Sequence, residues 1–225
     1  MPKFITFEGI EGCGKTTQLK LLANHLCEKG YSVCETREPG GTLIGDQIRK
    51  ILLNPENKNI SGITELFLYE ACRAQLIKEL RVGSRESGVR GNDKEFILCD
   101  RFIDSTIAYQ GYGRGIDTEI IEGLNMIASN DIKPDITILL DLNVKTGLAR
   151  ARGRNINVNV LQNNLSEGRF EEETLDFHEK VREGFLKIAS EEPDRVKVVD
   201  ATKGIEKIQK EIIRIVEMEQ KKIAV

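Results

Sequence analysis

One short stretch, Gly9–Thr16, constrains the fold of this chain more than any other feature of its sequence. It matches the phosphate-binding pattern G-x-x-x-x-G-K-[ST] at every required position. The apolar segment Lys3–Phe7 precedes it, and Thr17–Leu26 follows with apolar residues at helical spacing. A strand, a glycine-rich loop and a helix in this order form a phosphate site, because backbone N–H groups and the helix N-terminus then surround the phosphate oxygens.

The loop contains the residue types that contact a nucleoside triphosphate. Lys15 would bring a positive charge to the β- and γ-phosphates, and the hydroxyl of Thr16 is a ligand for Mg²⁺. The alternative, a glycine-rich turn without function, does not account for the flanking strand and helix. The residues expected to bind ATP are Gly9, Ile10, Glu11, Gly12, Cys13, Gly14, Lys15, Thr16 and Thr17.

The composition is that of a soluble protein with one domain over residues 1–225. A net charge of −3 argues against a nucleic-acid-binding protein that neutralises phosphates with a basic face. The five cysteines are odd in number and include no C-x-x-C pair, which favours reduced thiols in the cytoplasm. No apolar run approaches the roughly 18 residues of a membrane span, so we expect no membrane contact.

Short apolar segments alternate along the chain with segments of helical periodicity. The predicted strands are Phe4–Phe7, Ser32–Thr36, Phe96–Cys99, Ile136–Leu140 and Val196–Val199. The predicted helices are Lys15–Glu28, Leu43–Leu53, Ile63–Leu80, Ser105–Tyr109, Thr118–Ala128, Val144–Arg152, Glu171–Ala189 and Ile205–Lys221. The alternation predicts an α/β fold with a five-stranded parallel sheet and helices on both faces, so ligands should bind beyond the carboxyl ends of the strands.

Two polar segments lack this periodicity. Residues 82–94 are rich in glycine and predict a mobile surface loop. The asparagine-rich segment Gly153–Gly168 lies between two predicted helices, and the arginines before it favour a lid over about residues 150–169. In a phosphate-transfer enzyme such arginines close over ATP and neutralise charge in the transition state, whereas the alternative is a basic helix end. The lid arginines are Arg150, Arg152 and Arg154.

Charged residues follow the predicted strands. Asp100 ends an apolar strand and would hold Mg²⁺ together with Thr16, as a Walker-B acid does. Arg101 beside it would bind phosphate through its planar guanidinium group. A sharp turn after another strand would present Arg37 to the same space, and Arg49 on the next helix would point back toward it. A surface ion pair and solvated arginines are the alternatives for these residues taken singly.

Aromatic and amide side chains supply the features of a nucleoside site. Tyr69 and Arg73 share a helix face, where the ring would stack on a base and the guanidinium would donate to a ring carbonyl. Gln110 would hydrogen-bond a pyrimidine, and Tyr109 would fill the volume of a ribose 2′-hydroxyl. For Tyr69 and Arg73 alone, an aromatic ring in the core and a surface arginine remain the alternative.

Together these residues resemble the thymidylate kinases over nearly the whole chain. The most similar stretches are Phe7–Thr17, Thr36–Thr42, Cys99–Gly115 and Arg169–Ala189. The resemblance implies a P-loop NTPase fold with an arginine-bearing lid. It also implies phosphoryl transfer from Mg-ATP to dTMP, giving dTDP and ADP in dTTP biosynthesis, and a homodimer.

The resemblance implies a role for each matching residue. Glu11 would lie near the sugar 3′-hydroxyl, and Tyr69 stands where the family usually has phenylalanine. Gly12 occupies the position of the loop arginine found in some members, which leaves catalysis to Lys15, Arg101 and the lid arginines. The implied dTMP-binding residues are Glu11, Arg37, Arg49, Tyr69, Arg73, Arg101, Ser105, Thr106, Tyr109 and Gln110.

The reaction so implied needs no general base, because a phosphate monoester is mostly dianionic at neutral pH. This agrees with our interpretation of His25 and His178 as structural residues on helices away from the site. The intact Lys15, Thr16, Asp100 and Arg101 argue against an inactive interaction protein, and two other rival functions remain at this point. One is a P-loop kinase for dCMP, UMP, AMP or a nucleoside. The other is a nucleotide-dependent switch or binding protein, although the chain has no Asn-Lys-x-Asp guanine signature and no D-x-x-G after a strand.

Overall fold

The computed structural model describes residues 2–82, 94–161 and 168–223, and it contains the predicted five-stranded sheet. The strands are β1 (Lys3–Glu8), β2 (Val33–Arg37), β3 (Phe96–Asp100), β4 (Ile136–Asp141) and β5 (Val196–Asp200). All paired strands are parallel, and their order is β2-β3-β1-β4-β5. Because β1 is central, the loop that follows it leaves the middle of the edge where all carboxyl ends meet.

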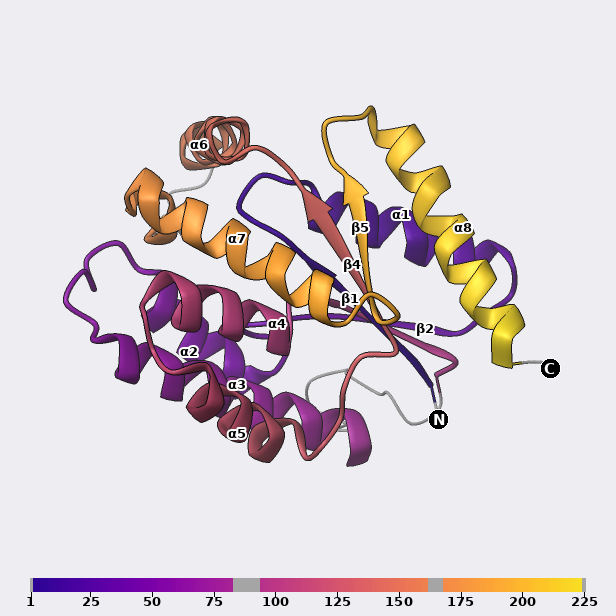
Figure 1. The fold of residues 1–225 in the computed structure, drawn as a ribbon, viewed down its shortest axis with the longest axis horizontal. Helices are drawn as coiled ribbons and strands as arrows, with labels where there is room; N and C mark the ends of the chain where they lie inside the picture. Colours follow the sequence, from indigo (N-terminus) through magenta and orange to yellow (C-terminus); the bar gives the residue numbers. More distant parts are fainter. Residues whose placement is uncertain (1, 83–93, 162–167, 224–225) are drawn as a thin grey trace.

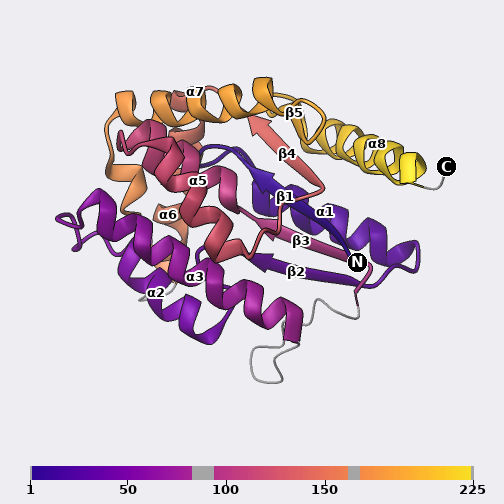
Figure 2. The same ribbon diagram turned by 60° about the horizontal axis from the view of Figure 1, so that its bottom comes forward.

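Helices cover both faces of this sheet, as predicted. They are α1 (Lys15–Glu28), α2 (Leu43–Leu53), α3 (Gly62–Val82), α4 (Ile103–Thr106), α5 (Thr118–Ser129), α6 (Val144–Leu161), α7 (Leu175–Glu191) and α8 (Ile205–Ile223). The helices α1 and α8 pack together at one side, whereas α2, α3 and α5 lie together at the other (Figures 1 and 2).

The central strand connects two apolar clusters, because successive side chains of a strand point to opposite faces. Ile5 belongs to a cluster with Leu22 of α1 and Ile212 of α8, and all three side chains are fully buried. The neighbouring Phe4 belongs to a second cluster, which contains Leu76 of α3. The sheet is therefore held between two layers of helices and provides a fixed base for the loops at its carboxyl edge.

Two helix boundaries differ from the sequence prediction. The helix expected to end at Arg152 continues to Leu161, so the first part of the predicted lid is helical. No proline follows Arg152 in this stretch, and a glycine alone costs a helix only about 1 kcal/mol. The helix expected from Glu171 begins at Leu175, because the Thr174 hydroxyl caps it by accepting a hydrogen bond from the backbone N–H of Phe177.

The segment after β3 also differs in its form. A helix was expected over Ser105–Tyr109, and the structure instead has α4 followed directly by a π-helical segment, Ile107–Gly113. Such wide turns are rare and occur frequently at functional sites. The wider turn belongs to the stretch that contains Tyr109 and Gln110, both of which were expected to bind the acceptor.

Parts of two sequence predictions lie outside the described residues. They are most of the loop predicted over residues 82–94 and the centre of the lid predicted over residues 150–169. Within the described ranges, no helix is long and apolar enough to cross a membrane.

Replacing Leu22 of α1 by alanine tests the packing of the first cluster. Because this side chain is fully buried against the central strand, we expect Leu22→Ala to lower the free energy of unfolding by about 2–5 kcal/mol. Urea unfolding monitored by circular dichroism measures the change. The matched control is Lys20→Ala, at an exposed position of the same helix, which should change the free energy by less than about 0.5 kcal/mol. Equal effects of the two substitutions would contradict the described packing.

Candidate functional site

The phosphate-binding loop (Gly9–Thr16) is packed tightly against two neighbouring elements. Gly9 and Gly12 have φ angles of 132° and 72°, which side chains rarely adopt. A Cβ atom at Gly9 would lie 2.5 Å from the carbonyl oxygen of Leu140 in β4, and one at Gly12 would clash with the carbonyl oxygen of Gly147 in α6. The glycines of the motif are therefore required by backbone conformation and by close packing.

The Lys15 ammonium group lies inside this loop. Its Nζ donates hydrogen bonds to the carbonyl oxygens of Gly9 and Ile10, at 3.0 and 2.9 Å. The side chain is buried, so these carbonyl groups hold its charge at a fixed place. The loop thus presents a cation surrounded by backbone, at the N-terminus of α1, and this arrangement suits phosphate oxygens.

The two predicted metal ligands are neighbours in the structure. The Thr16 hydroxyl donates to Oδ2 of Asp100 at 2.5 Å. Asp100 ends β3 and is paired with Phe7 of β1, which explains why residues so far apart in sequence meet. Within residues 2–82, 94–161 and 168–223, no group of three or more His, Cys, Asp or Glu side chains suits a metal ion. A hydroxyl and a carboxylate nevertheless fit Mg²⁺, which takes few protein ligands and completes its shell with phosphate oxygens and water.

Arg101 connects three parts of the site. Its Nη1 donates to the carbonyl oxygen of Gly9 and to Oγ of Ser105, each at 3.0 Å. Its Nη2 donates to Oε1 of Glu11 at 3.2 Å and to the hydroxyl of Tyr109 at 3.0 Å. The Tyr109 hydroxyl in turn donates to the same Glu11 oxygen at 2.5 Å. The structure therefore brings together the phosphate-binding loop, the end of β3 and the segment after it, as predicted from sequence.

Glu11 is ionised in this environment. Burial raises its pKa, but hydrogen bonding to His178, the charges of Arg101 and Lys15 and hydrogen bonding to Tyr109 outweigh burial and hold the pKa at about 2. The contact with His178 corrects our interpretation of this histidine as remote from the site. Its Nδ1 lies 3.3 Å from Oε2 of Glu11, because α7 crosses the sheet beside the loop. The periodicity of the sequence contains no signal for this contact.

Glu8, at the end of β1, is a site residue that the sequence analysis missed. It is fully buried, and its Oε1 accepts the backbone N–H of Phe102 at 2.7 Å. Its Oε2 accepts the Ser105 hydroxyl at 2.6 Å and lies 4.0 Å from Arg101. An acidic residue at the end of an apolar strand, directly before the loop, is the signal that could have identified it. Ser105, expected to line the base, is bonded to Glu8 and Arg101 instead.

The turn after β2 brings two predicted phosphate-binding arginines close together. Gly40 lies between them, because a Cβ atom there would be 3.4 Å from Nε of Arg37 and 3.5 Å from Cδ of Arg49. Arg49 donates to the carbonyl oxygen of Pro39 at 2.9 Å. The Arg37 side chain is about half exposed and lies 3.4 Å from Asp46, which leaves its guanidinium accessible. Both side chains therefore lie beside Gly40 in the turn after β2.

One face of α3 carries Glu65, Tyr69 and Arg73 at successive intervals of four residues. Burial and the charge of Glu65 raise the pKa of Tyr69, whereas Arg101, Arg169 and Arg49 lower it. Tyr69 therefore lies near Arg101, Arg169 and Arg49. The sequence analysis did not identify Glu65 as a site residue, although its position on the same helix face as Tyr69 and Arg73 indicates that it lies near them.

Arg73 differs from its prediction, because each of its five N–H groups already donates to a protein oxygen. Its side chain is only 1% exposed. The partners are Glu38, Glu70, Thr106 and Asn125. A hydrogen bond from Arg73 to a thymine carbonyl would require one of these groups to be shared or released. Thr106, also expected at the base, is buried in the same network.

Glu65 is a second buried charge of the site, and it accepts a hydrogen bond from Gln110. The amide nitrogen of Gln110 donates one of its two N–H groups to Oε1 of Glu65 at 2.7 Å, which fixes the orientation of the amide. Arg114 and Arg169 also donate to Glu65. Arg169 additionally donates to the carbonyl oxygen of Leu52 at the end of α2, so it anchors the chain that follows the predicted lid.

The lid arginines do not lie on one face of α6. Residues two apart on a helix are related by a rotation of about 200° about its axis, so the side chains of Arg150 and Arg152 point to nearly opposite sides. Arg150 lies 3.5 Å from the carbonyl oxygen of Ala201, after β5, whereas Arg152 donates to the carbonyl oxygen of Glu171 at 3.0 Å. The side chain of Arg154 is outside the described part of the structure. In this conformation Arg150 and Arg152 therefore lie against different segments of the chain and do not point to one common place.

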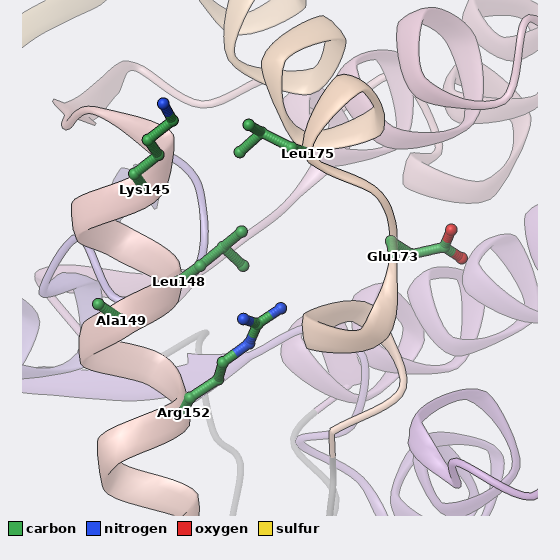
Figure 3. A pocket seen from close by; sticks show the side chains of 6 residues that line it. All are labelled: Lys145, Leu148, Ala149, Arg152, Glu173 and Leu175. Atoms are coloured by element: carbon green, nitrogen blue, oxygen red, sulfur yellow. The ribbon is translucent and has the colours of Figure 1, made fainter.

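A pocket of about 250 Å³ lies beside Arg152, between α6 and the segment before α7. Figure 3 shows the Arg152 guanidinium directed from α6 toward the opposite chain. The pocket is lined by Lys145, Leu148, Ala149, Arg152, Glu173 and Leu175. It contains none of the residues of the phosphate-binding loop, so it is a feature of the lid base and not the phosphate site.

Comparisons with known proteins agree on one family. The family model described as thymidylate kinase matches residues 7–212. A thymidylate kinase of Geobacter sulfurreducens is 52% identical over 206 residues, and one of Geotalea uraniireducens is 49% identical over 206 residues, each with 92% of both chains covered. The crystal structure of thymidylate kinase from Ehrlichia chaffeensis is 34% identical, with a TM-score of 0.70, covering 96% of this chain and 98% of that one.

Glu8 makes the stability of the protein depend on pH. Burial and the nearby Asp104 raise its pKa to about 7, although Arg101, Ser105 and Phe102 lower it. The folded state thus binds this proton more tightly than the unfolded state. The resulting stabilisation is complete below the ordinary pKa of 4.5 and is lost as the pH rises toward 7.

We expect Glu8→Gln, which resembles the protonated acid, to match the original protein near pH 4.5 and to exceed its stability above pH 7, by on the order of 3 kcal/mol. Urea unfolding across this pH range measures the difference. The control Glu35→Gln, at an exposed position of β2, should show no such trend. A constant difference between Glu8→Gln and the original protein at all pH values would refute this.

Proposed function

We propose that the residues around the phosphate-binding loop transfer the γ-phosphoryl group of ATP to dTMP, since the chain belongs to the thymidylate kinase family. It is a nucleoside-monophosphate kinase with the P-loop NTPase fold, and it forms dTDP and ADP. The observation that carries the proposal is the meeting of Lys15, Thr16 and Asp100 with Arg101 and Glu11 at adjoining strand ends. This meeting supports a triphosphate site directly beside a cationic group that would bind a second anion.

In this proposal the acceptor lies in the space bordered by the turn after β2, the face of α3 and the segment after β3. Arg37, Arg49 and Arg101 bind its phosphate, and the Tyr69 ring stacks on the base. Glu11 contacts the sugar 3′-hydroxyl, and Tyr109 occupies the volume that a ribose 2′-hydroxyl would need. Gln110 contacts the base through its amide group, which the hydrogen bond to Glu65 holds in place.

ATP binds along the phosphate-binding loop. Lys15 contacts its β- and γ-phosphates, and Thr16 and Asp100 would hold Mg²⁺, which neutralises phosphate charge. Of the lid arginines we propose Arg150 as the described candidate for contact with ATP, because it lies beside Ala201, just after the carboxyl end of β5. Arg152 is turned toward Glu171 and would have to move to reach the nucleotide.

The arrangement performs catalysis by alignment and neutralisation of charge. The attacking oxygen belongs to a phosphate that is mostly dianionic at neutral pH, so no side chain has to remove a proton. Two polyanions repel each other, and Arg101, held by the Gly9 carbonyl and by Glu11, provides a fixed cation between the two sites.

The decisive experiment is ADP release from Mg-ATP with dTMP, dUMP, dCMP, AMP or no acceptor. We expect the highest rate with dTMP, a lower one with dUMP and little release without an acceptor. Lys15→Ala should lower kcat at least about 100-fold because it removes a phosphate-binding charge, whereas Lys20→Ala on the exposed face of α1 should retain it. A higher rate with another monophosphate would overturn the assignment of the acceptor, and acceptor-independent hydrolysis would favour a nucleotide switch.

A homodimer is also part of the proposal. Large apolar side chains are exposed on three adjacent helices, α2, α3 and α5. Phe67 of α3 is 57% exposed and Ile127 of α5 is 76% exposed. The other exposed apolar residues of these helices are Leu43, Ile44, Ile51, Ile63, Ile120 and Met126. Burial of this surface against a second copy would remove it from water.

We expect Phe67→Glu to convert the dimer to a monomer, because it introduces a charge into an apolar interface. Sedimentation velocity measures the molecular mass of the original protein and of the variant. Met218→Glu is the control, since this residue is equally exposed on α8 at the opposite side of the sheet. A monomeric original protein, or a Phe67→Glu variant that remains dimeric, would exclude this interface.

A cytoplasmic location and the action of the chain as a single kinase domain complete the proposal. The location is supported by the five cysteines, all of which are free thiols and thus suit a reducing compartment.

A further inference from the structure

His178 is a fully buried histidine with an oxygen atom opposite each ring nitrogen. Its Nε2 lies 2.9 Å from the carbonyl oxygen of Phe170. Its Nδ1 lies 3.3 Å from Oε2 of Glu11. Among the described residues neither Nδ1 nor this carboxylate oxygen forms a regular hydrogen bond, so each is left with the other, 3.3 Å away. The two atoms therefore depend on each other.

The chemistry of the partners determines where the protons are. A carbonyl oxygen only accepts, so Nε2 of His178 must carry a hydrogen that it donates to Phe170. In a neutral ring with this hydrogen, Nδ1 would be a bare acceptor. It would then face the carboxylate oxygen of Glu11, another acceptor, and neither of these buried atoms has a hydrogen-bond partner in the described part of the chain. Such a pair is unfavourable unless one more proton lies between the two atoms.

The charges around the pair place this proton on the histidine. Oε1 of Glu11 already accepts from Tyr109 and Arg101, and these bonds favour the ionised carboxylate. Lys15 adds a second positive charge nearby. The other cations on this side are themselves neutralised, since Arg114 and Arg169 are paired with Glu65. A carboxylate with several donors retains its charge and accepts from Nδ1.

We propose that His178 is an imidazolium that donates from Nδ1 to Glu11, and that it is a positioning residue for this carboxylate. With Tyr109 and Arg101 on one oxygen and His178 on the other, both oxygens of Glu11 are fixed and the orientation of the carboxylate is set. In the proposed function, on which this part rests, Glu11 contacts the sugar hydroxyl of the acceptor. His178 thereby links α7 and the chain after the lid to the orientation of the acceptor.

The protonation state is tested directly by NMR with ¹⁵N-labelled histidine on the free protein. The chain has only two histidines, and His25→Gln assigns their signals. At neutral pH we expect both ring nitrogens of His178 to be protonated. In Glu11→Gln we expect only Nε2 to remain protonated, because the amide of glutamine donates to Nδ1. A neutral His178 in the original protein would overturn the proposal, whether or not dTMP is the acceptor.

Two substitutions separate positioning from packing. The His178→Asn amide nitrogen occupies the place of Nδ1 and keeps a donor for Glu11, whereas the His178→Gln amide reaches the place of Nε2 and keeps the bond to Phe170. We expect KM for dTMP to stay within about 3-fold for His178→Asn and to rise at least about 10-fold for His178→Gln, with KM for ATP unchanged in both.

Which of the two variants has the higher KM for dTMP decides whether His178 positions Glu11 or only supports the Phe170 carbonyl. If His178 only supports the Phe170 carbonyl, His178→Gln would be the milder change, and this result would overturn the positioning role. If both variants fail to fold, the NMR comparison of the original protein with Glu11→Gln still decides. If the original protein does not phosphorylate dTMP but NMR shows His178 as an imidazolium, the proposed acceptor is rejected and the proton assignment is retained.

Discussion

The site depends on the guanidinium group of Arg101, which is the point where three chain segments meet. It binds the Gly9 carbonyl of the phosphate-binding loop, Glu11 of the same loop, and Ser105 and Tyr109 of the segment after β3. The backbone φ of Arg101 is 71°, which is unfavourable for a residue other than glycine. The hydrogen bonds around Arg101 maintain this strained conformation. Because its partners are carbonyl, carboxylate and hydroxyl oxygens, the cation is fixed before any ligand arrives, which favours phosphate binding without reorganisation.

Two further buried charges organise the acceptor side. Glu65 accepts hydrogen bonds from Gln110, Arg114 and Arg169. Arg73 donates hydrogen bonds to residues on α3, on α5 and in the turn after β2. Buried ion pairs contribute little net stability, because desolvation offsets the attraction between the charges. Their value here is geometric, since a fully bonded charge has one favoured arrangement. The helices that border the acceptor space are thereby held in register with the sheet.

Much of this could be predicted from sequence, because the deciding signals were local. The phosphate-binding loop was identified from glycine spacing, and the meeting of Thr16 and Asp100 followed from the rule that parallel strands end at one edge. The contacts of Glu8, Glu65 and His178 could not be predicted, because they depend on how side chains of distant segments pack, and no rule of strand order or spacing specifies that packing. The course of the chain after Arg152 was missed, because a helix ending there was expected and the structure continues it past Gly153 to Leu161.

By itself the sequence determined the α/β alternation, the identity of the phosphate-binding loop and the set of charged residues at the strand ends. These are properties of residue type and of spacing along the chain, and they need no knowledge of neighbours. Only the tertiary structure decided which charges pair. In the tertiary structure all five N–H groups of Arg73 donate hydrogen bonds within the core. Arg150 and Arg152 contact different segments. The tertiary structure also brought His178 to Glu11, because α7 crosses the sheet beside the loop, and such crossings arise from packing between distant segments.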